Sequence, residues 1–561
     1  MTDGARYLPL LALAIPLLGA GALAVWPARE RLARFERPLF LASLALSLAL
    51  LVVAGLGRTM VVQFPFWGEP FLLGRALGFT MDYLSLMCAM LLIGSLLAVA
   101  LDERPEETQR EAAVVALFVG GAGVAVLLAA NMATLCLAWV FLDLALLWID
   151  TRHASRSGAV GAVRNLFLRT ASTIALVAAT VLVLAQQGDA PIPLLEAEGL
   201  ARPLLMATAL LRIGLYPLPG GLERTWLAYL VSATTGGYLW LRLASLSVGG
   251  LPGAGWLLPV AGTVLLLTGV LAALSGEEPA GEAYLLSHWL ALLVLAPLVQ
   301  ASGGVRVGLA AVVNIALAVV PLAAAAGGVR RGLAWRLPAL VRALAAGGGP
   351  LTVGFLARWA FLRVAWEEGH TGLFAVAVAA FALASVPAWR QASLAPAPPE
   401  TAGDGAPPAP DAAPSERPAA RIAALVGGYL PAVVLVVGGT APALLGAIGA
   451  RLISRFSLPL AEGYGAVSWA GAPAYAAAAA LLVLAVGYVL ARGIAGGRPS
   501  PARLTAHTFL EMDWLYSSAE RTLAWTEAAI ARGAAVIEEG PAALGWILLW
   551  LLAGLFLLTG R

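Results

Sequence analysis

Residues 131–149 read NMATLCLAWVFLDLALLWI, an uninterrupted apolar run with one charged side chain, Asp143, near its middle. An α-helix of about 20 such residues crosses the ~30 Å hydrocarbon layer of a membrane. The run is continuous and does not alternate between apolar and polar residues, as a barrel strand would. Because only helices and closed barrels satisfy the backbone inside a bilayer, the run predicts a transmembrane helix.

Similar runs recur along the whole chain. Of its 561 residues, 60% are hydrophobic and 12% are charged, with a mean hydropathy of +0.87, whereas soluble domains carry about 25% charged residues. We therefore predict an all-α polytopic membrane protein with about 14–16 transmembrane helices. The predicted spans are 7–26, 38–57, 77–101, 111–129, 131–149, 164–186, 201–219, 226–248, 255–275, 283–302, 305–327, 338–366, 371–390, 421–448, 470–492 and 541–559.

The composition also argues against several kinds of site. Cys88 and Cys136 both lie inside apolar runs, which predicts no disulfide framework, no metal site and no cluster-type cofactor. The net charge of +3 is small and spread over the loops, so nucleic-acid binding has no support. All 35 basic residues are arginine, and the sequence contains no lysine.

A proline-rich segment separates the predicted helices into groups. Residues 394–419 contain eight prolines and almost no large apolar side chain, which predicts an extended or disordered linker. Before it, we predict N-terminal helices in 1–76 and a transmembrane core in 77–390. After it, residues 420–561 form a C-terminal part. There, segment 503–540 mixes charged and apolar positions, as an amphipathic helix before a final span would, although a soluble-facing hairpin would also fit.

Ionisable residues lie inside several predicted spans, where each costs several kcal/mol unless it is paired or hydrated. Asp143, Arg212, His288 and Arg358 lie within such spans, and Asp82 begins one. Asp82 suits the positive end of a helix dipole, so it is either a helix cap or a functional carboxylate. Together these residues predict a polar axis through the bundle. Such an axis passes protons or cations, or it holds the helices in register as isolated structural pairs.

Two of the charges lie beside predicted helix breaks. Arg212 precedes Pro217 and Pro219, and Arg358 follows Pro350 and Gly354. Broken helices occur at membrane depth where the backbone lines a cavity or is covered by protein. Arg242, at the end of its predicted span, is expected to reach toward the membrane interface.

These features resemble the antiporter-like membrane subunits shared by complex I, Mrp-type cation/proton antiporters and membrane-bound hydrogenases. The segments that carry the resemblance are Met81 to Leu86 (MDYLSL), Asn131 to Trp139 (NMATLCLAW), Leu211 to Pro219 (LRIGLYPLP), Gly236 to Arg242 (GGYLWLR), Pro350 to Arg358 (PLTVGFLAR) and Glu511 to Tyr516 (EMDWLY). The resemblance implies two inverted five-helix repeats, each with a broken helix, and protons that move along a line of titratable residues.

The chain departs from this family at the titratable positions. Val140 follows Trp139 where the family has Glu, and Asp143, one turn further on, is the candidate to take over that role. The family's broken-helix lysines correspond to Arg212 and Arg358, and arginine holds its proton where a buried lysine can release it. Two further lysine or histidine positions correspond to residues that do not ionise, namely Thr234 and either Val319 or Val320.

Three functions follow from the sequence. The first is an ion-translocating subunit of a larger complex I-like, Mrp-like or hydrogenase-like assembly, with protons or Na⁺ moving past Asp143, His288 and water. The second is a non-pumping scaffold subunit of such a complex. The third is the membrane energy-coupling partner of an inorganic-carbon or other transporter. In each case, the expected partners are the lipid bilayer and other membrane subunits, in the cytoplasmic (inner) membrane of a bacterium. We expect no catalytic centre in the chain itself, although the assembly can be an NADH/quinone or hydrogenase-type oxidoreductase.

Overall fold

The computed structural model describes residues 7–25, 35–55, 61–64, 77–102, 110–153, 159–187, 192, 198–216, 226–247, 251, 253–275, 278–325, 333–393, 418–441 and 474–495, with a few single residues between 510 and 528. The chain divides into two units, Met1–Arg498 and Pro499–Arg561. The final predicted span, 541–559, and the predicted linker up to residue 417 lie outside the described residues, as does most of 503–540.

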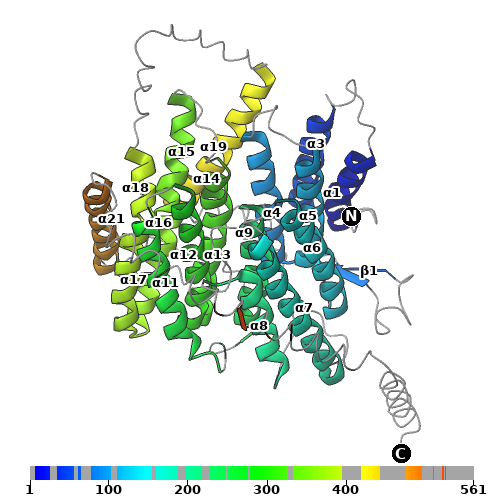
Figure 1. Ribbon diagram of the computed structural model, residues 1–561, viewed down its shortest axis with the longest axis horizontal. Coiled ribbons are helices and arrows are strands. Elements are labelled where there is room, and N and C mark those ends of the chain that lie inside the picture. The colour runs from blue at the N-terminus through cyan, green and yellow to red at the C-terminus, as the bar shows by residue number, and fades with distance from the viewer. Residues whose placement is uncertain are drawn as a thin grey trace, which may run out of the picture. The chain divides into compact units, whose positions relative to one another are not determined.

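The first unit is a bundle of helices that run roughly side by side (Figure 1). Its first helices are α1 (Leu8–Val25), α3 (Glu36–Gly55), α4 (Tyr83–Asp102), α5 (Arg110–Leu128), α6 (Met132–His153), α7 (Ala159–Gln187) and α8 (Ala201–Ile213). The next are α9 (Trp226–Val231), the π-helical turn η4 (Ser232–Gly236), α10 (Gly237–Leu246), α11 (Leu257–Leu274), α12 (Glu278–Val299) and α13 (Ala301–Asn314). The remaining elements are the π-helical turn η5 (Ile315–Val319), α14 (Val320–Ala325), α15 (Leu333–Ala346), α16 (Val353–Glu367), α17 (Thr371–Ala384), α18 (Val386–Ser393), α19 (Pro418–Thr440) and α21 (Ala474–Ala495).

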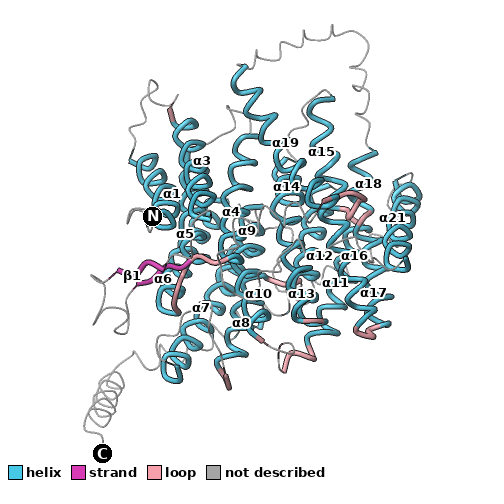
Figure 2. The backbone as a smooth tube through the Cα atoms, turned by 180° about the vertical axis from the view of Figure 1, so that it is seen from behind, coloured by secondary structure: helices cyan, strands magenta, loops and turns pink. Residues whose placement is uncertain are grey.

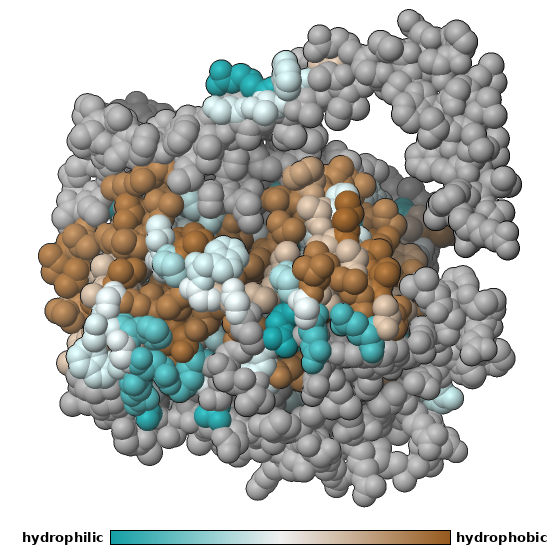
Figure 3. Space-filling view, turned by 90° about the horizontal axis from the view of Figure 1, so that it is seen from below, coloured by the Kyte–Doolittle hydropathy of each residue, from teal (hydrophilic) through white to brown (hydrophobic). Residues whose placement is uncertain are grey.

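The helices confirm the predicted fold class. Nine of the described helices are long and apolar enough to cross a membrane, and shorter apolar helices lie in α6, α15, α19 and α21. Described helical segments together cover the greater part of every predicted span up to residue 492. Seen from below in Figure 3, most of the coloured surface is hydrophobic, and the hydrophilic residues form separate groups. The protein is an all-α polytopic membrane protein.

Burial shows which helices form the centre. In the apolar stretch of α12, 94% of the residues are buried inside the bundle, and in that of the α13–α14 segment, 89% are. The corresponding share for α1 is 33%. The helices α11, α13, α16 and α18 pack around α12. Side chains on α12 and on the α13–α14 segment therefore meet other helices instead of lipid.

Two helices end close to the predicted breaks. In the group α5, α6, α7, α8 and α9–α10, the fourth helix ends at Ile213, and Gly214 adopts a left-handed φ of 66° there. In the group α11, α12, α13–α14, α15–α16 and α17, the fourth is interrupted between Ala346 and Val353. The predicted span 338–366 thus consists of two helices, and the predicted break residue Pro350 lies between them, because the sequence GGGPLT cannot continue α15.

The predicted span 77–101 is wrong at its beginning. Residues Leu77–Thr80 form strand β2, which pairs antiparallel with β1 (Val61–Phe64) as Val61 opposite Thr80. The two strands are seen beside α6 in Figure 2. Gly78 accepts a hydrogen bond from the Ala130 amide (2.9 Å) and donates one to Thr134 Oγ1 (3.0 Å), so the start of α6 stabilises the strand.

Candidate functional site

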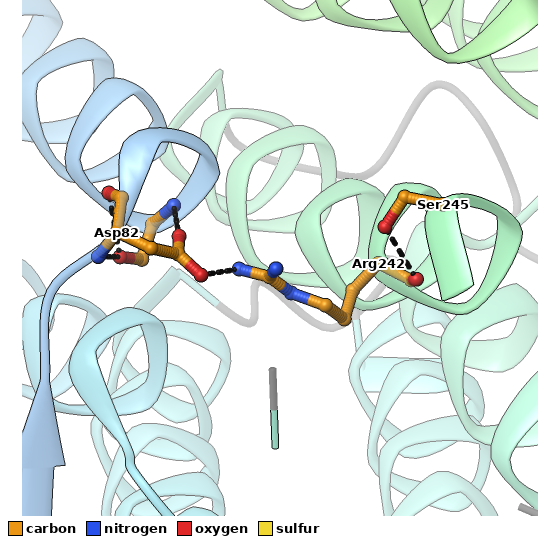
Figure 4. A network of polar contacts seen from close by, with 4 residues as sticks. Asp82, Arg242 and Ser245 are labelled. Atoms are coloured by element: carbon orange, nitrogen blue, oxygen red, sulfur yellow. Dashed lines mark hydrogen bonds and ion pairs between the residues drawn. The ribbon is translucent and has the colours of Figure 1, made fainter. Parts of the chain in front are cut away.

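A buried ion pair joins the start of α4 to α10. Arg242 Nη2 donates to Asp82 Oδ2, and both side chains are at most 5% exposed (Figure 4). Asp82 Oδ1 also accepts the Ser85 amide at 2.9 Å and so caps α4. Asp82 therefore serves as a cap and as a counter-ion. The expectation that Arg242 reaches the interface is wrong, because its guanidinium finds a carboxylate inside the bundle.

A second ion pair joins α6 to α8. Arg212 Nη1 donates to Asp143 Oδ1, and the Thr173 hydroxyl of α7 donates to Asp143 Oδ2. The Arg212 guanidinium lies 4.3 Å from the ring centre of Trp139, close enough for a cation–π interaction. Arg212 is 2% exposed and Asp143 is 18% exposed. The shifted carboxylate thus meets the arginine of the broken helix.

Arg358 lies in the second turn of α16 and points back toward the helix interruption. Its Nη1 donates to Gly347 O and, at 3.2 Å, to Phe381 O. Its guanidinium carbon lies 5.1 Å from the ring centres of Trp289 and of Phe381. Among the described residues, no carboxylate forms an ion pair with Arg358, and its Nε and Nη2 have no hydrogen-bond partner.

His288 lies in the middle of α12 and is fully buried. Its Nδ1 lies 3.1 Å from Leu265 O of α11. Because a carbonyl can only accept, Nδ1 carries the hydrogen, and in the neutral ring Nε2 is then a free acceptor. Nε2 has no partner among the described residues. The ring packs edge-on against Phe381, which also contacts Arg358. His288 and Arg358 thus share one aromatic neighbour.

Asn314 is a polar residue of the bundle centre that was not predicted as a site. It ends α13, is fully buried, and neither atom of its amide has a partner in the described structure. A Cβ added to Gly354 would lie 3.1 Å from Asn314 Oδ1. The signal was present in the sequence, because Asn314 is the one polar side chain within GLAAVVNIALAVV. It was missed because a neutral amide adds little to a search for charges.

The positions where the family has further titratable residues fall at the π-helical turns. Thr234 lies within η4, where its hydroxyl donates to Leu230 O at 2.8 Å. Of the two candidates for the other position, Val319 ends η5 and Val320 begins α14 directly after it. The two turns contact each other. Ser95 of α4 donates to Ala316 O of η5 at 2.6 Å, which satisfies a carbonyl of that turn. These positions retain backbone irregularity without a titratable side chain.

The structure brings the predicted residues into separate groups. Asp82 pairs with Arg242, Asp143 pairs with Arg212, and His288 lies near Arg358 through Phe381. Of the predicted break residues, Pro350 lies in the interruption between α15 and α16, and Gly354 is the second residue of α16. Pro217 and Pro219 lie outside the described residues.

Comparison with known proteins shows the fold. No protein-family model matches the chain, and no curated protein is significantly similar to it in sequence. A chain in the structure of the Mrp complex from Dietzia sp. DQ12-45-1b matches with a TM-score of 0.74 and 18% identity over 98% of this chain. This chain spans 62% of that chain's length. A chain of the membrane-bound sulfane sulfur reductase, an archaeal respiratory membrane complex, matches with a TM-score of 0.70 and 18% identity, covering 97% of this chain and 99% of that one. The resemblance indicated by the motifs is thus confirmed at the level of the fold.

Proposed function

We propose that this chain is an antiporter-like membrane subunit of a larger complex and that protons move along the buried polar groups of its bundle. The proposal is supported by the fold, which is shared with chains of two multisubunit membrane complexes. It is also supported by the polar side chains of α6, α8, α12, α13 and α16, which lie at the middle or at the interruption of their helices.

The observation that carries the proposal is the unpartnered Nε2 of His288. An imidazole can accept and release a proton at one nitrogen while the other nitrogen keeps its hydrogen bond. The Leu265 carbonyl holds the ring in one tautomer and leaves Nε2 facing the bundle interior. His288 thus supplies the proton-exchanging group that the arginines cannot supply.

Water is the expected connection between these groups. Buried polar atoms in proteins almost always have a partner, either protein or ordered water. Unpartnered buried atoms occur in Arg212, His288, Asn314 and Arg358. Water beside these side chains would satisfy those atoms and would link His288 to its neighbours by hydrogen bonds.

The test is proton uptake by the complex, purified through a tag on this chain and reconstituted in liposomes that contain a pH-sensitive dye. We expect His288→Gln to slow uptake by about tenfold or more, the scale of lost acid–base chemistry. His370→Gln, between α16 and α17, is the matched control and should leave the rate unchanged. Equal rates for the wild type and His288→Gln, in a complex that still assembles, would reject the proton path.

One observation favours a scaffold subunit instead. Both predicted carboxylates, Asp82 and Asp143, are paired with arginines, which keep their protons. Fixed pairs hold helices together without exchanging charge. Under this alternative, His288→Gln and Asp143→Asn would both leave proton uptake unchanged, while loss of either ion pair would reduce the yield of assembled complex.

A further inference from the structure

We propose that the interruption between α15 and α16 binds a small monovalent inorganic anion of the halide class, with Arg358 and Asn314 as its ligands. This anion site is separate from the proposed proton path and does not depend on it, because an anion can bind to the protein without any proton transport.

The first argument is the charge of Arg358. This side chain is 2% exposed, and among the described residues it has no carboxylate within ion-pair distance. Three other buried arginines, Arg212, Arg242 and Arg342, each have one. A buried, always-protonated guanidinium without a counter-charge is strongly unfavourable, and carbonyls and aromatic rings offset only part of that cost.

The second argument is the direction of the free donors. Side chains on a helix lean toward its N-terminus, so the Arg358 side chain extends back toward the interruption. There it lies against Gly348, where an added Cβ would be 2.6 Å from Arg358 Nη1. Nη1 is occupied by Gly347 O and Phe381 O, whereas Nε and Nη2 remain free. The free edge of the guanidinium is thus held in place beside the interruption.

The third argument is Asn314, which brings a second unpartnered polar group to the same place. Gly354 and Arg358 are four residues apart and therefore share a face of α16. Asn314 is fully buried and lies against Gly354 through its Oδ1, and neither Oδ1 nor the donor Nδ2 of the same amide has a partner in the described structure. Gly354 also lies in the first turn of α16, where the helix carries partial positive charge. The described structure gives these unpartnered groups no carboxylate, and both Arg358 and the start of α16 are positive, which favours an anion over a cation.

The aromatic surroundings of Arg358 restrict the ligand. Trp289 and Phe381 lie against the guanidinium, and both are fully buried. Trp289 Nε1 is occupied by Ala346 O at 2.8 Å. These rings place apolar surface beside the guanidinium, which suits a weakly hydrated halide better than a strongly hydrated oxyanion.

The experiment measures thermal unfolding of the detergent-solubilised complex in chloride, bromide or gluconate salts at one ionic strength. We expect the melting temperature of the wild type to be roughly 2–4 °C higher in chloride or bromide than in gluconate. Arg358→Met should abolish that difference and, in gluconate, should melt above the wild type because the unpaired charge is gone. Arg363→Met, on the exposed side of the same helix, is the matched control and should keep the full difference.

Three results would overturn the site: equal melting in all salts for the wild type, a halide difference that survives in Arg358→Met, or bromide-soaked crystals without an anomalous peak beside Arg358 Nη2. The last measurement uses only the wild type, so it decides the matter even if Arg358→Met does not assemble. None of these readouts involves proton movement, so failure of the proton path and failure of the anion site are distinguishable.

Discussion

Asp82 and Arg242 are 160 positions apart in the chain, and they form an ion pair between the start of α4 and the middle of α10. Asp82→Asn should keep the helix cap while leaving Arg242 buried and unpaired. We expect a loss of about 3–5 kcal/mol in the free energy of unfolding, measured by titration with denaturing detergent. The double variant Asp82→Asn with Arg242→Met should recover most of that loss. A single variant as stable as the wild type would show that the pair contributes nothing.

The hydroxyl of Thr173 supports the second ion pair through Asp143. Thr173→Val removes one hydrogen bond to a charged group and keeps the shape of the side chain. The expected loss of stability is about 1.5–3 kcal/mol. Thr263→Val is the matched control, because that exposed hydroxyl bonds only to its own helix at Pro259 O, and it should change stability by less than about 0.5 kcal/mol. Similar effects of the two changes would contradict the role of Thr173.

Position 354 requires a glycine because the backbone of Ala345 passes close to it. A Cβ at this position would overlap the carbonyl oxygen of Ala345. Gly354→Ala should therefore cost about 1–3 kcal/mol, as overpacking does. Gly372, in the first turn of α17, has open space around an added Cβ, so Gly372→Ala should instead gain up to about 1 kcal/mol. Opposite shifts in melting temperature would support this packing, and a gain for both variants would refute it.

Leu351 is the one described residue other than glycine with a positive φ, at 64°. The left-handed conformation costs a residue with a side chain about 1–2 kcal/mol. Because Leu351 is 62% exposed, little packing is lost on its removal. Leu351→Gly should raise the melting temperature slightly, and the β-branched Leu351→Val should lower it. The two shifts are measured on the same complex, and shifts of the same sign would exclude backbone strain as their cause.

Much of the fold could be predicted because its signals are local. Apolar length locates the helices, and GGGPLT marks the interruption before α16, although not its exact bounds. Charges inside apolar runs identified Asp143 and Arg212 without showing that they meet. Arg242 was misplaced because its position in a span says nothing about a carboxylate 160 residues away. Asn314 was missed because its environment is set by tertiary packing, and neither π-helical turn has a sequence signal that hydropathy reveals.

The two π-helical turns set the rotational phase of the helices that follow them. A π turn accommodates one extra residue, and one residue corresponds to a rotation of about 100° around a helix axis. Arg242 lies beyond η4 on a continuous helix. A chain one codon shorter within Ser232–Gly236 would have nearly the same composition and hydropathy, but Arg242 would face a different neighbour. The partners of the buried charges are therefore decided as much by the count of residues between them as by which residues they are.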